Sequence, residues 1–188
     1  MMRILGIPGS VRAGSWNRRL LEAAVRLVPA DVELVPYDGL GTLPLFDEDL
    51  ERGGDGLHAV RRLHDAVAQA DGLLFATPEY NQSLPGVLKN AIDWLSRPVT
   101  DDVLAGRPAA IIGATSGPWG TRLAQAELRH VLGVTGCLLL PQPRLYVRDA
   151  AAAFDARGAL VHEPTRKQLA EVLAAFHDWI HLVTPVTA

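Results

Sequence analysis

The chain has 188 residues, of which 48% are hydrophobic, and its formal net charge at pH 7 is −3. This length and apolar content are enough to bury one sizeable core, so we expect a single domain over residues 1–188. The near balance of charge, the lack of any segment long enough to span a membrane and the single cysteine predict a cytoplasmic protein without nucleic-acid partners, membrane contacts or disulfides.

The first predicted turn is rich in small residues and joins a strand to a helix. A short apolar run ends at Ile7, and residues spaced for a helix begin at Leu20. Between them, residues 9–17 read Gly-Ser-Val-Arg-Ala-Gly-Ser-Trp-Asn. The first amides of a helix have no intrahelical acceptor and carry partial positive charge, so a turn of this kind favours an anion.

Hydroxyl and amide side chains and one arginine within this turn can donate hydrogen bonds to an anion. They are Ser10, Arg12, Ser15 and Asn17. Gly9 and Gly14 are expected to allow unusual backbone conformations and a close approach of the ligand. We therefore predict a phosphate-binding loop; the alternative is an ordinary strand–helix turn in which Ser15 caps the helix and nothing is bound.

Several well-known phosphate motifs do not match this loop. A nucleoside-triphosphate loop needs a lysine that is missing here, and a dinucleotide fingerprint starting at Gly6 would need glycines where Pro8 and Val11 stand. A phosphatase loop needs a nucleophilic cysteine, whereas Cys137 lies far along the chain in an apolar run and is expected to be an inert core residue. What remains is a loop that binds a monophosphate without cleaving it.

The next predicted strand, residues 32–36, alternates apolar and polar side chains, which is typical of a sheet edge. A long loop over residues 38–56 follows. Its apolar segment 43–46 suggests a lid, a subunit contact or packing onto the core, and its acidic run 47–49 is expected to be solvated. A helix is predicted around residues 60–67.

Residues 73–76 form a continuous apolar run, which indicates a strand covered on both faces in a parallel sheet. Further strands are predicted at 109–114 and 137–140, and further helices from Pro85, Leu123 and about Pro164. Five strands alternating with five helices predict a doubly wound α/β fold, a three-layer sandwich with helices on both faces of the sheet. The pattern is consistent with the flavodoxin-like strand order 2-1-3-4-5.

In that order, the loops after strands 1, 3 and 4 meet at one crevice. The second loop, Pro78–Ser83, supplies main-chain amides, two side-chain amides and the ring of Tyr80. The third, Ser116–Thr121, supplies a Gly-Pro turn and Trp119. Such groups suit a flat heterocycle with a polar edge, and a phosphate joined to such a ring describes FMN.

Two separated motifs carry a resemblance to a known family. The motif Gly9-Ser10-x-Arg12-x-x-Ser15-x-Asn17, together with Pro78-Glu79-Tyr80-Asn81 and the following Pro85–Trp94 segment, resembles the NADPH-dependent FMN reductases, which include quinone, chromate and azo-dye reductases. The resemblance covers almost the whole chain, including Leu43–Leu45 and Phe154–Asp155. It implies a flavodoxin-like fold, bound FMN, reduction by NADPH or NADH, and assembly as a homodimer or homotetramer.

The resemblance also implies which residues contact FMN. Those at the phosphate are Ser10, Arg12, Ser15, Asn17 and the backbone of Trp16. Those along the isoalloxazine ring are Pro78, Glu79, Tyr80 and Asn81, with Ser116 and Gly117 flanking its other side.

No side chain is assigned a catalytic role, because the flavin carries the hydride chemistry. Glu79 is a candidate proton donor, but a structural or interfacial role is favoured. Trp16 is expected to cover the phosphate or meet another subunit, and Trp119 either stacks near the substrate or packs under its loop. His177 and His181 lie four residues apart on the last helix, but no third ligand follows, so no metal site is predicted.

The favoured function is an NAD(P)H-dependent oxidoreductase that passes hydride through FMN to a small acceptor such as a quinone, chromate or an azo compound. One alternative is a flavodoxin-type electron carrier, although such carriers tend to be strongly acidic. Another is a reductase that releases reduced FMN. No 2′-phosphate site can be assigned, and a subunit interface is expected at the helix of Asp93–Trp94 and at Leu43–Phe46.

Overall fold

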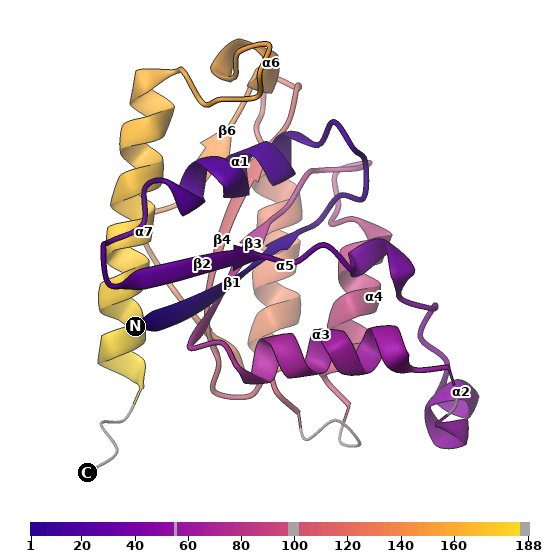
Figure 1. The fold of residues 1–188 in the computed structure, drawn as a ribbon. Helices are drawn as coiled ribbons and strands as arrows, with labels where there is room; N and C mark the ends of the chain where they lie inside the picture. Colours follow the sequence, from indigo (N-terminus) through magenta and orange to yellow (C-terminus); the bar gives the residue numbers. More distant parts are fainter. Residues whose placement is uncertain (55, 98–101, 185–188) are drawn as a thin grey trace.

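The fold is built around a parallel sheet, seen in a computed structural model that describes residues 1–54, 56–97 and 102–184 (Figure 1). The strands of these described residues are β1 (Met2–Pro8), β2 (Val32–Pro36), β3 (Gly72–Ala76), β4 (Pro108–Ala114), β5 (Leu138–Leu139) and β6 (Leu145–Val147). Their order is β2-β1-β3-β4-β5, with β6 also paired to β4, and every pairing is parallel. The predicted order and the edge position of β2 are confirmed.

The fifth strand differs from its prediction because it is split in two. A single strand at 137–140 was expected, whereas β5 pairs with the start of β4 and β6 pairs with its end. Pro141 and Pro143 lie between the two pieces. A proline has no N–H to donate to a ladder, so the pairing stops there and resumes at Leu145.

Helices cover both faces of the sheet, as predicted (Figure 1). They are α1 (Trp16–Val25), α2 (Glu48–Gly53), α3 (His58–Ala68), α4 (Gly86–Leu95), α5 (Arg122–Val134), α6 (Ala150–Ala153) and α7 (Glu163–Val183), with a short 3-10 turn at Leu40–Thr42. One core packs α1 and α7 against the sheet, and a second core packs α3, α4 and α5 against the other face. The alternation of strand side chains feeds both cores: in β3, Leu73 and Phe75 belong to one and Leu74 and Ala76 to the other.

The acidic run Asp47–Asp49 begins a helix, so the predicted loop is wrong at this point, although all three residues are exposed as expected. Asp47 accepts a hydrogen bond from the amide of Asp49 at 2.8 Å and caps α2. Acidic residues in a first helical turn are favoured by the helix dipole. Arg52 forms ion pairs with Glu48 and Asp49, one turn earlier in the same short helix.

The apolar segment Leu43–Phe46 packs on α4. The carbonyl of Pro44 accepts hydrogen bonds from Asn90 Nδ2 at 2.8 Å and Trp94 Nε1 at 2.9 Å. The Phe46 ring lies edge-on to Trp94, with the centroids 5.0 Å apart. Of the three expectations for this segment, packing onto the core is therefore the one observed, while Leu45 stays 82% exposed. No helix among the described residues has the length and apolar character needed to cross a membrane.

Candidate functional site

A cleft of about 290 Å³ opens where β1, β3 and β4 end, between the three loops that follow these strands. It is lined by Ser10, Arg12, Ser15, Trp16, Asn17, Pro78, Glu79, Tyr80, Ala114, Thr115 and Ser116. All the predicted contact residues except Asn81 and Gly117 are thus brought together. Ala114 and Thr115 were missed; they stand at the carboxyl end of β4, and that position is the signal that could have identified them.

The loop from Ser10 to Ser15 makes hydrogen bonds within itself, to α1 and to the loop after β3. Ser15 caps α1, since its Oγ accepts from the amide of Arg18 at 3.3 Å. Ser10 Oγ lies 3.2 Å from Tyr80 Oη, and the Arg12 guanidinium donates to the Gly14 carbonyl at 2.9 Å. The loop is thereby set before any ligand binds.

The amides of Trp16 and Asn17 open the first turn of α1, where no intrahelical acceptor exists. With the hydroxyls of Ser10 and Ser15 and the charge of Arg12, they form a donor set without acidic members. This chemistry fits a phosphate monoester at a helix N-terminus.

Asn17 reaches across to β4. Its side chain is 2% exposed, donates to the Ala114 carbonyl and accepts from the Ala114 amide, each at 2.8 Å. The oxygen and the nitrogen of the carboxamide are therefore both bonded to β4, which fixes the side chain, and the main-chain N–H of Asn17 stands in the first turn of α1.

The two glycines of the loop act differently from the prediction. Neither Gly9 nor Gly14 is among the residues with positive φ, so neither supplies an unusual conformation. A Cβ on Gly9 would lie 3.1 Å from Leu88 and 3.2 Å from Pro78. The small size of Gly9 therefore lets this loop pack against the loop after β3.

The second loop closes as a tight hairpin. Tyr80 and Ser83 exchange two backbone hydrogen bonds, at 3.1 and 3.0 Å, and the residues between them, Asn81 and Gln82, have φ of 49° and 65°. Asparagine tolerates this left-handed region better than most residues. Asn81 thus shapes the loop instead of lining the cleft, and Tyr80 presents a half-exposed ring beside it.

Glu79 caps a helix of the scaffold. Its Oε2 accepts from the amides of Leu123 at 2.9 Å and Ala124 at 3.0 Å, in the first turn of α5. Thr121, the N-cap residue by position, makes no side-chain cap of its own. The carboxylate of Glu79 takes that role, which accords with the structural function favoured for it.

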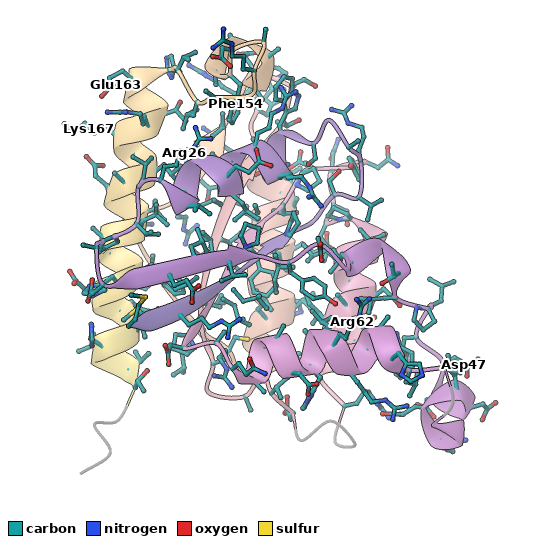
Figure 2. All side chains as sticks on the ribbon, in the orientation of Figure 1. Arg26, Asp47, Arg62, Phe154, Glu163 and Lys167 are labelled. Atoms are coloured by element: carbon teal, nitrogen blue, oxygen red, sulfur yellow. The ribbon has the colours of Figure 1, made fainter. Side chains whose placement is uncertain are left out.

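The two loop tryptophans have separate environments. The Trp16 ring stacks on Phe154, which Figure 2 labels, with centroids 5.6 Å apart and an interplanar angle of 23°. Arg19 lies over the Trp16 ring. Trp119 is 74% exposed, so it does not pack under its loop. Gly117, beside it, accepts a backbone hydrogen bond from Asp149 at 3.3 Å, which ties the third loop to the segment after β6.

A larger hollow of about 710 Å³ lies on the other side of the third loop, with Trp119 at its rim. It is lined by three arginines, Arg122, Arg144 and Arg148, and no ion pair to any of them is found within the described part of the chain. Asp149 is the acidic residue in its lining. The hollow is positively charged, and sequence analysis missed it because Arg122 opens α5 whereas Arg144 and Arg148 flank β6, more than 20 residues further along the chain.

The comparisons with known proteins agree with this geometry. The model of the NADPH-dependent FMN reductase family matches residues 2–152. The chain is 42% identical over 181 residues to an NAD(P)H-dependent FMN reductase of Pseudomonas aeruginosa, covering 95% of each chain. It is 40% identical over 179 residues to a 2-hydroxy-1,4-benzoquinone reductase of Burkholderia sp, covering 95% of this chain and 96% of that one.

Among solved structures, the flavoenzyme NAD(P)H:(acceptor) oxidoreductase of Paracoccus denitrificans superposes with a TM-score of 0.88 at 36% identity. The match covers 97% of this chain and 98% of that one. The chain therefore belongs to the NADPH-dependent FMN reductase family.

Proposed function

We propose that this protein reduces quinones or similar small acceptors with NAD(P)H, using FMN held in the cleft at the ends of β1, β3 and β4. The observation that carries the proposal is the cleft itself, in which a helix N-terminus with hydroxyls and one arginine faces the ring of Tyr80. Membership of the family confirms the predicted cofactor, the NAD(P)H co-substrate and the oxidoreductase class. Relatives named quinone reductases, one of them 32% identical from Escherichia coli, support the choice of acceptor.

When bound, FMN supplies the hydride chemistry, so the work of the protein is binding and positioning. Ser10, Arg12 and Ser15, with the amides of Trp16 and Asn17, hold the phosphate. The hairpin after β3 and the start of the third loop border the ring. Because Glu79 fixes the hairpin to α5, the ring-binding edge is rigid before the cofactor arrives.

The arginine-lined hollow is where we propose that NAD(P)H binds, next to the flavin cleft. The hollow and the cleft are separated by the loop that contains Ser116 and Trp119. A nicotinamide stacked on the ring would leave its phosphates to extend over this loop. Arg122, Arg144 and Arg148 would then pair with them, and the 2′-phosphate of NADPH would gain the most.

The proposal includes a homodimer or homotetramer in the cytoplasm. The exposed Leu45, on the segment packed against α4, is where we place a subunit contact. The single, buried cysteine suits a reducing compartment. Light scattering on the eluted peak of a gel-filtration column would give the subunit number, and a monomer at micromolar concentration would contradict the assembly.

An anaerobic absorption experiment tests the function. The purified protein should show a flavin spectrum, or acquire one with added FMN, and NADPH or NADH should bleach it. Adding a benzoquinone should then restore the oxidised spectrum and support steady turnover. Bleaching that requires a partner reductase would indicate an electron carrier, and flavin that elutes separately on gel filtration after reduction would indicate release of reduced FMN.

A further inference from the structure

Three side chains from distant segments converge at the end of the sheet opposite the cleft. Asp31 precedes β2 and sits beside the start of β1, because its carbonyl accepts from the amide of Met2 at 2.9 Å. His177 and His181 lie one turn apart near the end of α7, which runs along this edge (Figure 1). One ligand atom from each of the three residues lies within 4.8 Å of the other two.

This cluster supplies the third ligand that the sequence did not reveal. His177 Nε2 lies 3.1 Å from Asp31 Oδ2 and 3.3 Å from His181 Nε2, although Asp31 is 146 residues away along the chain. A search for metal motifs in the sequence finds ligands at short spacings, and a carboxylate from the opposite half of the chain escapes it.

His177 lies between two carboxylates and the second imidazole. Its Nδ1 lies 3.1 Å from Asp178 Oδ1 and its Nε2 lies 3.1 Å from Asp31 Oδ2, so in the absence of a metal ion a protonated ring can donate to both carboxylates. A metal ion at this point would take the place of the proton on Nε2, between the Asp31 carboxylate and the second imidazole, while Nδ1–H keeps its bond to Asp178. A carboxylate that holds one ring nitrogen while the other binds the ion is the usual arrangement around metal-bound histidine.

The spacing of the ligand atoms suits a tetrahedral ion. Zinc binds imidazole nitrogen and carboxylate oxygen at about 2.0–2.2 Å, which places neighbouring ligand atoms of a tetrahedron about 3.3–3.5 Å apart. Two of the distances in the cluster, 3.1 and 3.3 Å, are already close to that value. Asp31 and His181 are exposed and free to adjust, and water can complete the coordination.

We propose that Asp31, His177 and His181 bind a divalent transition-metal ion, with Zn²⁺ as the best match to two imidazoles and a carboxylate. The ion would fasten the C-terminal part of α7 to the β1–β2 edge. Its role is structural, because the cleft lies at the other end of the strands.

Calorimetric titration of the FMN-loaded, untagged protein with zinc chloride tests the site after chelator treatment and dialysis. We expect one equivalent to bind with a Kd in the micromolar range or below. At free Zn²⁺ about a hundredfold above Kd, the melting temperature should rise by roughly 5–10 °C. X-ray absorption at the zinc edge should show imidazole ligands at about 2.0 Å.

Matched variants decide whether these three residues form the site. His181→Gln and Asp31→Asn change exposed side chains, so the fold should remain, and each should weaken Zn²⁺ binding at least about tenfold. His130→Gln changes an exposed histidine on α5 outside the cluster and should leave binding unchanged. Failure of the parent protein to bind one equivalent, or equal binding by all variants, would overturn the proposal.

Discussion

Arg12 is the one formal positive charge in the loop of residues 9–17, and it is exposed at the mouth of the cleft. We expect Arg12→Gln to weaken FMN binding about tenfold or more, since a hydrogen bond to a charged group contributes about 1.5–3 kcal/mol. Riboflavin, which lacks the phosphate, should bind both proteins equally. Flavin-fluorescence titrations with the two ligands check this prediction.

Arg26→Gln is the matched control for that experiment, because Arg26 lies at the far end of α1 from the loop (Figure 2). It should leave both affinities unchanged. If Arg12→Gln lowered the affinity for riboflavin as much as for FMN, the effect would come from the shape of the loop and not from the phosphate.

Glu79 offers a second test at the residue scale, because its carboxylate caps α5. We expect Glu79→Gln to lower the free energy of unfolding by about 1 kcal/mol, since the amide keeps one acceptor but loses the charge. Turnover at saturating substrate should stay within about twofold. Thermal melts and steady-state assays measure the two effects, with Glu171→Gln on the exposed face of α7 as the control.

A proton-donor role for Glu79 predicts the opposite pair of results. Turnover would fall a hundredfold or more while the melting temperature stayed near that of the parent. The two readouts therefore separate a capping residue from a catalytic one.

Cys137 is buried, and burial raises the pKa of its thiol to about 11, with a hydrogen bond to Thr135 opposing the rise. The unfolded thiol ionises near pH 8.5, so the folded protein binds this proton more tightly. The contribution of the thiol is fully present below about pH 8.5 and is lost as pH rises towards 11. Relative to Cys137→Ala, the parent should lose about 1–2 kcal/mol of stability between pH 8 and pH 10, measured by urea unfolding.

Reaction of the native thiol with a disulfide reagent at pH 8 should be slow compared with that of the unfolded protein. Rapid labelling of the native protein would contradict the buried, protonated state.

The role of a side chain was predictable where its hydrogen-bond partner lies close to it in the sequence. The cap by Ser15, given in the sequence analysis as the alternative to a phosphate contact, is observed, because its donor is the amide of Arg18 only three residues further on. The pairing of Asn17 with Ala114 spans 97 residues and depends on the strand order, so the sequence could point to Asn17 but not to what holds its side chain. The predicted phosphate and ring contacts remain predictions to be tested by the titrations above.

At the scale of elements, the contact between β3 and α7 depends on a glycine. A Cβ on Gly72 would lie 2.6 Å from Ile180 Cδ1 and 2.9 Å from Phe176 Cζ. We expect Gly72→Ala to push α7 from the sheet and to lower stability by about 1–3 kcal/mol. Gly133→Ala on α5 adds a methyl group to open space and should be neutral or stabilising by up to about 1 kcal/mol.

Urea or thermal unfolding of the two glycine variants measures this difference. A Gly72→Ala protein as stable as its parent would show that α7 can shift without cost. The activity of either variant should follow its folded fraction, because both glycines lie away from the cleft.

Elements with a strong pattern were predictable and short ones were not. The continuous apolar run of β3 and the alternation of β2 identified a central and an edge strand, and both positions are confirmed. The helix α2 escaped because its 6 residues contain none that is buried. The strand β6 escaped because 3 residues after a proline-rich turn carry too little periodicity to be seen.

For the whole molecule, the arginine-lined hollow predicts a preference between the two dinucleotides. Arg144→Gln should raise KM for NADPH by about tenfold, raise KM for NADH much less, and leave kcat within about twofold. Initial rates with each donor at a fixed quinone concentration measure this. Arg61→Gln, on α3 and outside the lining of the hollow, is the control and should change neither KM.

Equal rises in KM for NADPH and NADH would indicate that Arg144 contacts the pyrophosphate, which both donors share. No rise in either KM would show that the hollow does not bind the donor. Such a feature could not be read from the sequence, since Arg122, Arg144 and Arg148 share no motif and meet through the pairing of β6 with β4. The same is true of Asp31 beside α7. Sites whose residues come from distant segments, such as this hollow and the cluster of Asp31 with α7, leave no local pattern in the sequence.

The two hydrogen bonds between Asn17 and Ala114 have a consequence for cofactor exchange. They join the amino end of α1, where we propose that the phosphate binds, to the last residue of a central strand. A local opening that frees the phosphate by moving α1 must also break both bonds and expose a buried carboxamide. Where the cofactor leaves by such an opening, its retention and slow amide hydrogen exchange at Ala114 report the same opening free energy.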